Sequence, residues 1–232
     1  MRLEKLSYLK YYAKVLFDNW TNKKESYAQH GEDRLIDLLL PYGVTSFIDI
    51  GANDGVLFSN TYKFAKMGAS GLCVEPSKSS HRKLKLNHLF HHKVKCVNSA
   101  ISDQNSIVFL QEAGYEKTLS RVDKKATKNS IRVKCQTFDK LISRYPKFEE
   151  IDLLSIDVEG HEKEIFKGLT NKKFRSKLIV IESDKTQTKE LLTLDSLKEY
   201  RSIYTNGINT IFVHCKEFHK MPRVLPEGFE EC

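Results

Sequence analysis

The feature that most constrains this chain is the segment SFIDIGANDG at residues 46–55. A short apolar run carries one acid, Asp49, and opens onto a loop between Gly51 and Gly55. Such a run predicts a buried strand that leads into a turn where a ligand approaches the backbone closely. The loop lacks the Lys-Ser/Thr ending of a P-loop and the spacing of the dinucleotide motif G-x-G-x-x-G. We therefore expect a nucleotide-like ligand at the carboxyl end of a parallel sheet, without phosphate as its main anchor.

The composition is typical of a single globular domain with a basic surface. The chain has 232 residues, of which 40% are hydrophobic and 29% are charged, so one domain can build a substantial core. Its net charge of +8 favours anionic partners such as nucleic acid, sugar nucleotides or an acidic membrane surface. Five cysteines, odd in number and without a C-x-x-C pair, indicate a reducing compartment, the cytoplasm, and no structural zinc.

The first 25 residues form a separate segment in this interpretation. Apolar residues recur there at near-helical spacing between lysines, which predicts a basic amphipathic helix over residues 1–25. The helix either packs on the domain, which we favour, or rests on a membrane surface as a peripheral contact. No apolar run approaches the length of a bilayer span, and residues 26–232 are expected to form a single domain.

Strand-like and helix-like segments alternate after residue 42, which is typical of a parallel α/β sheet. Strands are predicted at residues 46–50, 71–75, 93–101, 151–157, 178–182 and 208–213. Helices are predicted around residues 58–65 and 77–89 and at residues 138–145, 161–169 and 189–201. Two further strands, 107–111 and 131–136, are expected to form a hairpin or edge insertion around a basic loop at 117–130.

Two acids occupy informative positions, and the first of them, Asp49, lies inside the first predicted strand. Glu75 ends the second strand, where a carboxylate can accept hydrogen bonds from both hydroxyls of a ribose. Backbone N–H groups of the Gly51 to Gly55 loop suit a carboxylate, while Asp49 suits an ammonium group. S-adenosylmethionine, with its ribose, adenine, sulfonium and amino-acid tail, fits this set.

Several blocks together resemble the FkbM family of S-adenosylmethionine-dependent methyltransferases. They are SYAQHGED at 26–33, FIDIGAN at 47–53, VEP at 74–76, NSAISD at 98–103, TFD at 137–139 and IDLLSIDVEGHE at 151–162. The resemblance implies a Rossmann-like class I methyltransferase fold, with a mostly parallel seven-stranded sheet flanked by helices. It also implies methyl transfer to oxygen, on a sugar hydroxyl of a glycan or glycolipid or on a natural product.

By position, the resemblance assigns cofactor contacts along the whole carboxyl edge. Residues around the methionine part would be Asp49, Gly51, Ala52, Asn53 and Gly55, those near the ribose Glu75 and Pro76, and those beside the adenine Ser99 and Ala100. Asp157 would face the point where donor and acceptor meet. Gln29 and Glu32, from the first block, would close over the cofactor.

A hydroxyl acceptor needs a route for its proton, and three residues are candidates. His161 has the suitable intrinsic pKa, and Asp157 or Glu159 could orient it or accept the proton directly. An alternative is structural, because acids are favoured where a helix begins. Asp157, Glu159 and Glu182 could also supply oxygen ligands to magnesium, but nothing in their spacing requires it, and no metal is predicted.

Other functions are open on the sequence. RNA methylation is supported by the cations at residues 121–134, but aromatic side chains are not interleaved with them, so nucleic acid is disfavoured as a partner. A non-catalytic module with a methyltransferase-like fold is a further alternative. We expect a small-molecule or glycan acceptor, held by residues 113–130 and by the segment after Glu182.

Overall fold

The computed structural model describes residues 10, 13–14, 17, 24–111, 121–123, 130–222 and 227–232. Its helices are α2 (Glu32–Leu39), α3 (Tyr62–Lys66), α4 (Lys78–Asn87), α5 (Phe138–Arg144), α6 (Glu162–Lys167), α7 (Lys185–Leu191) and α8 (Cys215–Phe218), with 3-10 turns η2 (Pro146–Phe148) and η3 (Asp195–Leu197). Its strands are β1 (Ser46–Ile50), β2 (Ser70–Val74), β3 (Val94–Val97), β4 (Ala100–Ser102), β5 (Ser106–Gln111), β6 (Arg121–Asp123), β7 (Ile131–Thr137), β8 (Glu150–Ile156), β9 (Arg175–Glu182), β10 (Tyr200–Thr205), β11 (Asn209–His214) and β12 (Glu230–Glu231). The N-terminal helix predicted for residues 1–25 lies almost entirely outside the described residues.

The main sheet has the order β12-β10-β11-β9-β8-β1-β2-β3. The run from β9 to β3 is parallel, whereas β11, β10 and β12 are antiparallel additions at one edge. The predicted α/β architecture with a mostly parallel sheet is therefore confirmed, with one correction. The sheet has eight strands rather than seven, because two residues near the C-terminus pair with β10.

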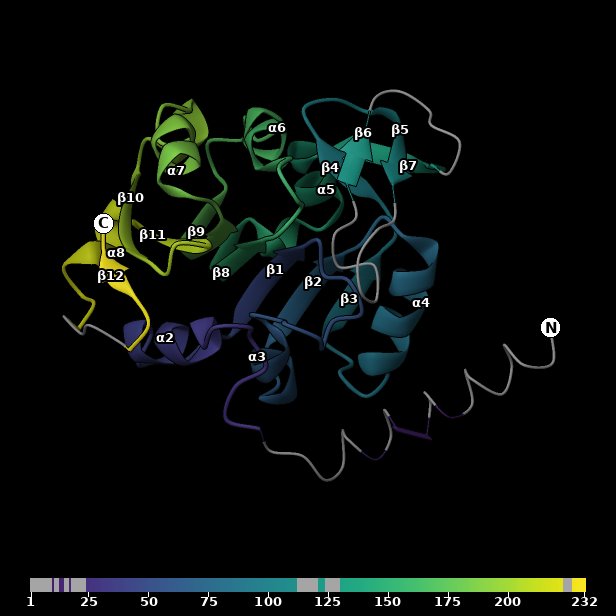
Figure 1. Cartoon of the computed structure of the whole chain (residues 1–232), viewed down its shortest axis with the longest axis horizontal. Coiled ribbons are helices and arrows are strands. Elements are labelled where there is room, and N and C mark those ends of the chain that lie inside the picture. Colours follow the sequence, from purple (N-terminus) through teal and green to yellow (C-terminus); the bar gives the residue numbers. More distant parts are fainter. Residues whose placement is uncertain are drawn as a thin grey trace.

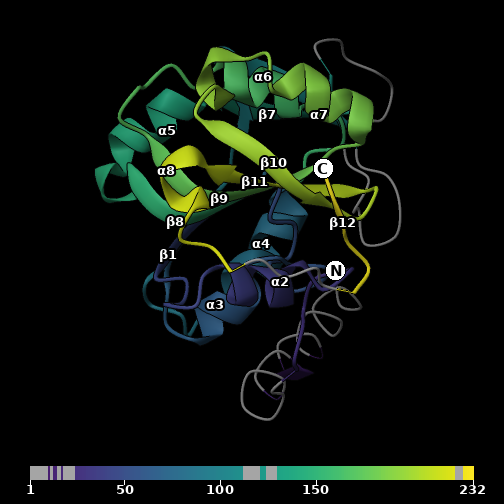
Figure 2. The same cartoon turned by 90° about the vertical axis from the view of Figure 1, so that its left-hand side faces the viewer.

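Helices cover both faces of this sheet, as Figures 1 and 2 show for α6 and α7 on one face and α2 and α3 on the other. Alternate residues of β1 divide between the layers: Ile48 belongs to the same core as Phe166 of α6, and Phe47 belongs to the same core as Ile36 of α2. Alternation of this kind is expected for a strand buried on both faces. Each layer thereby has a core of its own, and the sheet separates the two.

Local capping explains where several helices begin. The Ser77 side chain accepts from the backbone of Ser80 at the start of α4, and Thr137 does the same at the start of α5. Asp184 and Gln187 form a complete capping box for α7. Each cap satisfies N–H groups that have no partner within the helix.

Several predicted elements differ from the structure. The strand expected at 93–101 is two strands in different sheets, β3 and β4. The expected hairpin is part of a second, four-stranded sheet with the order β4-β7-β5-β6, and β6 lies in the segment predicted as a loop. The helix predicted at 189–201 is wrong: Leu191, Leu197 and Tyr200 are all buried in one core layer, but a 3-10 turn brings Leu197 there and β10 begins at Tyr200.

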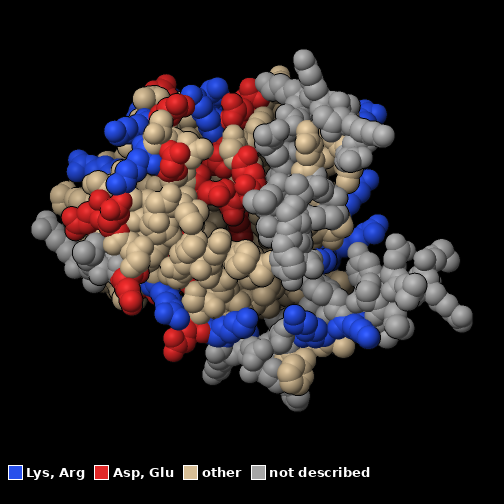
Figure 3. Space-filling model, viewed as in Figure 1, with Lys and Arg blue, Asp and Glu red and all other residues tan. Residues whose placement is uncertain are grey.

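Charges are distributed unevenly over the surface. Figure 3 shows Asp and Glu side chains gathered in a hollow near the middle of one face, whereas Lys and Arg lie mainly towards the periphery of that face. Within the described residues, no helix has both the length and the apolar composition needed to cross a bilayer.

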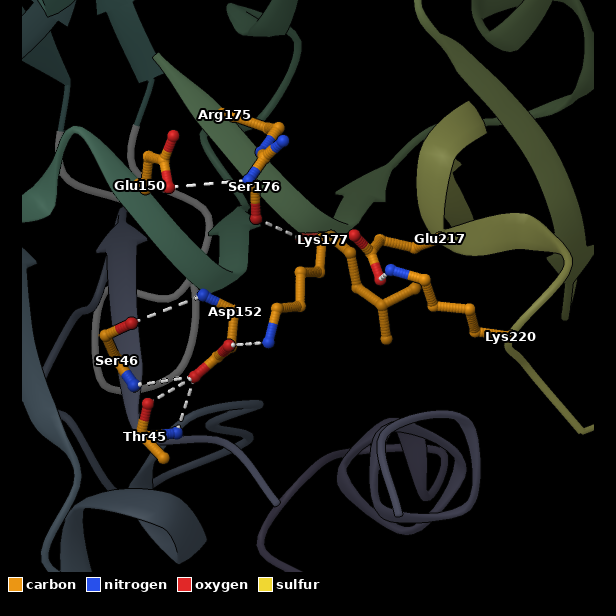
Figure 4. Close-up of polar contacts among 10 residues, drawn as sticks. Thr45, Ser46, Glu150, Asp152, Arg175, Ser176, Lys177, Glu217 and Lys220 are labelled. Atoms are coloured by element: carbon orange, nitrogen blue, oxygen red, sulfur yellow. Dashed lines mark hydrogen bonds and ion pairs between the residues drawn. The ribbon is translucent and has the colours of Figure 1, made fainter. Parts of the chain in front are cut away.

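A buried aspartate fixes the amino ends of three neighbouring strands (Figure 4). Asp152 of β8 accepts hydrogen bonds from the backbone N–H and the hydroxyl of Thr45, both at 2.7 Å, and from the backbone N–H of Ser46 at 3.1 Å. Its second oxygen pairs with Lys177 of β9 at 2.7 Å. Burial alone would raise the pKa of Asp152, but these hydrogen bonds outweigh it and hold the pKa below its usual value. The contacts hold β1, β8 and β9 together at the edge opposite the candidate site.

Candidate active site

The candidate site lies where β1, β8 and β9 end. Gly51 follows β1 directly and adopts a φ of 87°, in the left-handed region that favours glycine. A Cβ atom at this position would overlap the backbone carbonyl oxygen of Asp157. The two loops therefore approach each other as closely as they do only because residue 51 has no side chain.

Four acids gather at this edge. One carboxylate oxygen each from Asp157, Glu159 and Glu182 lies within 4.8 Å of the others. Asp49 lies beneath them, buried, and accepts a 2.6 Å hydrogen bond from the Thr61 hydroxyl. The hollow of acidic side chains in Figure 3 is consistent with this grouping.

The grouping shifts the pKa values of these acids upward. Burial raises the pKa of Asp49 to about 6 despite its hydrogen bonds from Thr61 and Ser155. Desolvation, repulsion from Glu182 and a hydrogen bond with it raise the pKa of Asp157 well above its usual value. Solvent reaches the Asp157 side chain through the cavity, which weakens the effect of desolvation and makes repulsion from Glu182 the main cause of the shift. Desolvation and the same neighbour raise the pKa of Glu159 to about 7.

The backbone around the acids is strained. Among the described residues, the non-glycine residues with positive φ are Asn53, Phe58 and Glu159, at 47°, 58° and 57°. All three line one cavity of about 430 Å³, which we call the larger cavity. Conformations of this kind cost about 1–3 kcal/mol each and cluster at functional sites.

The larger cavity combines an acidic floor with a wall of polar and apolar side chains. Asp49, Asp157, Glu159 and Glu182 belong to the floor. The remaining lining residues are Gln29, Gly51, Ala52, Asn53, Leu57, Phe58, Ser59, Asn60, Ser155 and Ile208. Phe58 and Ile208 are large apolar side chains that remain exposed at 47% and 43%.

A smaller neighbouring cavity holds the predicted ribose acid. Its lining includes Gly51, Asn53, Glu75, Pro76, Ser99, Ala100, Asp157, Glu159 and His161, together with apolar Ile50, Val74, Ile101 and Val158. Glu75 is buried, and its two oxygens accept from the backbone N–H groups of Asn53 at 3.0 Å and Ser77 at 2.7 Å. The carboxylate is thus held in one orientation by the β1 loop and by the start of α4.

His161 occupies the wall of the smaller cavity just before α6. Its Nε2 lies 2.8 Å from the hydroxyl of Ser102 in β4, and its Nδ1 lies 3.9 Å from Glu164. It does not line the larger cavity. These contacts join the second sheet to the loop after β8.

Two predicted cofactor residues lie elsewhere. Gly55 faces α4, because a Cβ there would meet Leu84 and His88. Glu32 is fully buried and lines neither cavity; it accepts from the side-chain amides of Asn206 at 2.9 Å and Asn209 at 2.7 Å. It therefore fastens the N-terminal block to the turn between β10 and β11, which carries Ile208.

The wall residues Leu57, Phe58, Asn60 and Ile208 were not predicted from the sequence. Residue 58 was assigned to a helix, but α3 begins only at Tyr62, and an isolated bridge joins Phe58 to Ala28 instead. Nothing in the local pattern at residue 208 indicates a wall position, because its place depends on the antiparallel turn that precedes β11.

Comparisons with known proteins place the chain in a family. Residues 49–225 match the model of the methyltransferase FkbM domain, and no curated protein matches the chain. Methyltransferase FkbM from Methylobacillus flagellatus KT is 12% identical with a TM-score of 0.47, and the match covers 73% of this chain but only 43% of that one. The O-methyltransferase from Bacillus cereus in complex with SAH is 11% identical over 88% of this chain and 90% of that one, with a TM-score of 0.47. Precorrin-6y C5,15-methyltransferase from Geobacter metallireducens GS-15 is 13% identical over 83% and 92%, with a TM-score of 0.46. This chain belongs to the FkbM methyltransferase family.

Proposed function

We propose that the chain transfers a methyl group from S-adenosylmethionine to a hydroxyl oxygen, and that the acceptor is a sugar hydroxyl on a glycan, glycolipid or natural product. The observation that carries the proposal is the junction of the two cavities. Gly51, Asn53, Asp157 and Glu159 line both of them, so a donor in one and an acceptor in the other would meet at these residues. In-line transfer needs such close and aligned approach.

The smaller cavity suits the donor by its chemistry. Glu75 presents a fixed carboxylate for ribose hydroxyls, and Val74 and Ile101 are among the apolar side chains available to an adenine ring. Asp49 lines the larger cavity beside the residues that the two cavities share, and it places negative charge where the cationic sulfonium and ammonium of the donor would lie. When bound, S-adenosylmethionine supplies a methyl group on a positively charged sulfur.

We assign the acceptance of the hydroxyl proton to Glu159. It lines both cavities, and with a pKa of about 7 it is ionised in about half of the molecules at neutral pH. Asp157 shares a hydrogen bond with Glu182 and is favoured in its protonated form, so it holds the acid group together. His161 lines only the smaller cavity, which suits it to positioning the loop after β8.

The larger cavity suits an uncharged, hydroxyl-bearing acceptor. Its carboxylates and the amides of Gln29 and Asn60 can bond hydroxyl groups, and Phe58 and Ile208 offer apolar surface to the C–H faces of a sugar ring. A phosphate would meet several carboxylates at short range, which argues against RNA as the acceptor. Five unpaired thiols support the proposal that the reaction takes place in the cytoplasm.

The first experiment measures donor binding by calorimetry. We expect Glu75→Ala and Asp49→Ala to weaken S-adenosylmethionine binding at least about tenfold, in line with the loss of one charged hydrogen bond. Glu150→Ala, at an exposed surface ion pair with Arg175, is the matched control and should bind normally. Normal affinity in both site variants would contradict the donor assignment.

The second experiment identifies the acceptor. Labelled-methyl transfer should be screened over methyl glycosides, sugar nucleotides, glycolipids and RNA, with and without a chelator. We expect transfer to a sugar hydroxyl that the chelator does not change. Donor binding without transfer to any acceptor would favour the non-catalytic module, and transfer to RNA alone would overturn the sugar assignment.

A further inference from the structure

Three turns lie side by side at the sheet edge opposite the cavities. They are residues 40–45, 67–69 and 88–93, which lead into β1, β2 and β3. The backbone N–H of Ser70 donates to the carbonyl of Thr45 at 2.8 Å and so joins the first turn to the second. Lys93 joins the second to the third, because its Nζ donates to the carbonyl of Gly68 at 3.2 Å.

These turns carry exposed apolar side chains. Tyr42 is 98% exposed, Met67 67%, Phe90 53% and Leu89 45%. They are four of the ten large hydrophobic side chains that are exposed within the described residues. Scattered apolar side chains are ordinary on a surface, but a group of them on adjoining turns marks an interaction site.

The segment that contains the second and third turns accounts for most of the net positive charge of the chain. Residues 61–98 contain eight Lys and Arg and a single acid, the buried Glu75, which gives +7 against +8 for the whole chain. Lys78, Arg82 and Lys85 lie at helical spacing along the outer stripe of α4, and all three are exposed. Within the described part of the chain, no acid forms an ion pair with any of these three.

We propose that this amino-edge surface docks on an anionic membrane surface. The amino-edge surface is made of the apolar residues Tyr42, Met67, Leu89 and Phe90 with the cations Arg82, Lys85 and Lys93. The apolar tips would enter the boundary between headgroups and acyl chains, and the cations would lie at the level of anionic headgroups. Figure 3 shows Lys and Arg side chains along the lower border of the molecule, on the side where α3 lies in Figure 1. Leu89 and Met67 are aliphatic, which suits acyl chains better than stacked bases.

Docking by this edge leaves the catalytic edge accessible. The turns precede β1, β2 and β3, whereas the cavities lie where β1, β8 and β9 end. The acceptor would therefore approach from the side away from the bilayer. The surface is distinct from the predicted helix at residues 1–25, and it does not depend on the proposed reaction.

Flotation of the full chain with vesicles tests the proposal. We expect binding to vesicles of phosphatidylcholine mixed with phosphatidylserine, and at least about tenfold less to phosphatidylcholine alone, since each cation near an anionic surface adds attraction. Met67→Ser/Phe90→Ser should reduce binding to the mixed vesicles about tenfold. Ile107→Ser/Ile131→Ser, which changes two exposed apolar residues on the second sheet, is the matched control and should bind like the wild type.

A charge pair provides an independent check. Arg82→Gln/Lys85→Gln should lose about tenfold in binding, whereas Lys189→Gln/Lys198→Gln, two exposed lysines at α7 and after η3, should not. S-adenosylmethionine binding, measured in all four variants, should be unchanged and shows that each is folded. Equal flotation of surface and control variants, or no flotation of the wild type, would overturn the proposal. If the wild type binds RNA, the surface variants lose that binding, and their flotation with vesicles is unchanged, the surface would be assigned to nucleic acid instead.

Discussion

Gly51 provides the sharpest test of the site's geometry. Both Gly51 and Gly68 have a left-handed φ, 87° and 91°, so alanine at either position is strained by about 1–2 kcal/mol. The two differ in the space around a new Cβ. At Gly68 no described atom lies within 4 Å, whereas at Gly51 the Cβ would overlap the Asp157 carbonyl oxygen. Overpacking adds about 1–3 kcal/mol, so Gly51→Ala should destabilise the protein by about 2–5 kcal/mol in total.

Thermal unfolding of the two variants separates strain from overlap. For a chain of this size, 1 kcal/mol corresponds to roughly 2–4 °C in Tm. We therefore expect Tm to fall by roughly 2–12 °C more in Gly51→Ala than in Gly68→Ala, as the overlap adds about 1–3 kcal/mol. Donor binding should weaken only in Gly51→Ala, because the overlap displaces the loop after β8. Equal losses of Tm and normal donor binding in both variants would refute the argument that the two loops require a glycine for their close approach.

Three further predictions concern other acids and one buried histidine. Glu159→Gln should lower methyl transfer roughly 10²–10⁴-fold with donor affinity unchanged. The wild-type rate should rise with pH through about 7, where Glu159 loses its proton. A pH profile that is the same in Glu159→Gln would exclude this residue as the proton acceptor. Asp152→Ala should lower the free energy of unfolding by about 3–5 kcal/mol, because Lys177 and the Thr45 N–H lose a buried partner. The control Glu150→Ala should lower it by less than about 1 kcal/mol. Similar losses in the two variants, measured by denaturant unfolding, would contradict the role given to Asp152. Burial lowers the pKa of His88 to about 3 from 6.5, so the unfolded chain binds the proton first. Neutral His88 therefore contributes on the order of 4 kcal/mol to the free energy of unfolding above pH 6.5, and this contribution is lost as the pH falls towards 3. Denaturant midpoints measured between these two pH values test the loss. The exposed His92→Gln should leave that dependence intact, and a flat profile in the wild type would contradict the assignment.

The sequence predicts the donor half of the site better than the acceptor half. Gly51, Asn53 and Glu75 belong to local patterns, a strand followed by a turn, and parallel strands bring such turns to one edge wherever they occur in the chain. Asp157 and Glu159 follow the same rule after β8. These positions depend on the sheet order alone, which the alternation of elements indicates.

The wall of the larger cavity depends on longer-range pairing. Ile208 reaches the cavity because β10 and β11 pair in antiparallel fashion, and the leucine spacing before Tyr200 favours a helix over that pairing. Phe58 has a conformation that only tertiary contacts stabilise, so helical spacing gave the wrong element. Glu32 has the composition of a ligand-binding acid, and only the structure shows that its partners are Asn206 and Asn209.

The fastening of Glu32 to the turn before β11 also has a consequence for synthesis on the ribosome. Most of the smaller cavity comes from residues 50–161, which emerge while the last third of the chain is still untranslated. The wall of the larger cavity needs Ile208, and the partners of Glu32 are translated about as late. Because chains fold progressively as they emerge, a nascent chain would acquire its donor half well before its acceptor half. Glu32 is made early in synthesis, so it lacks its amide partners until Asn206 and Asn209 are translated.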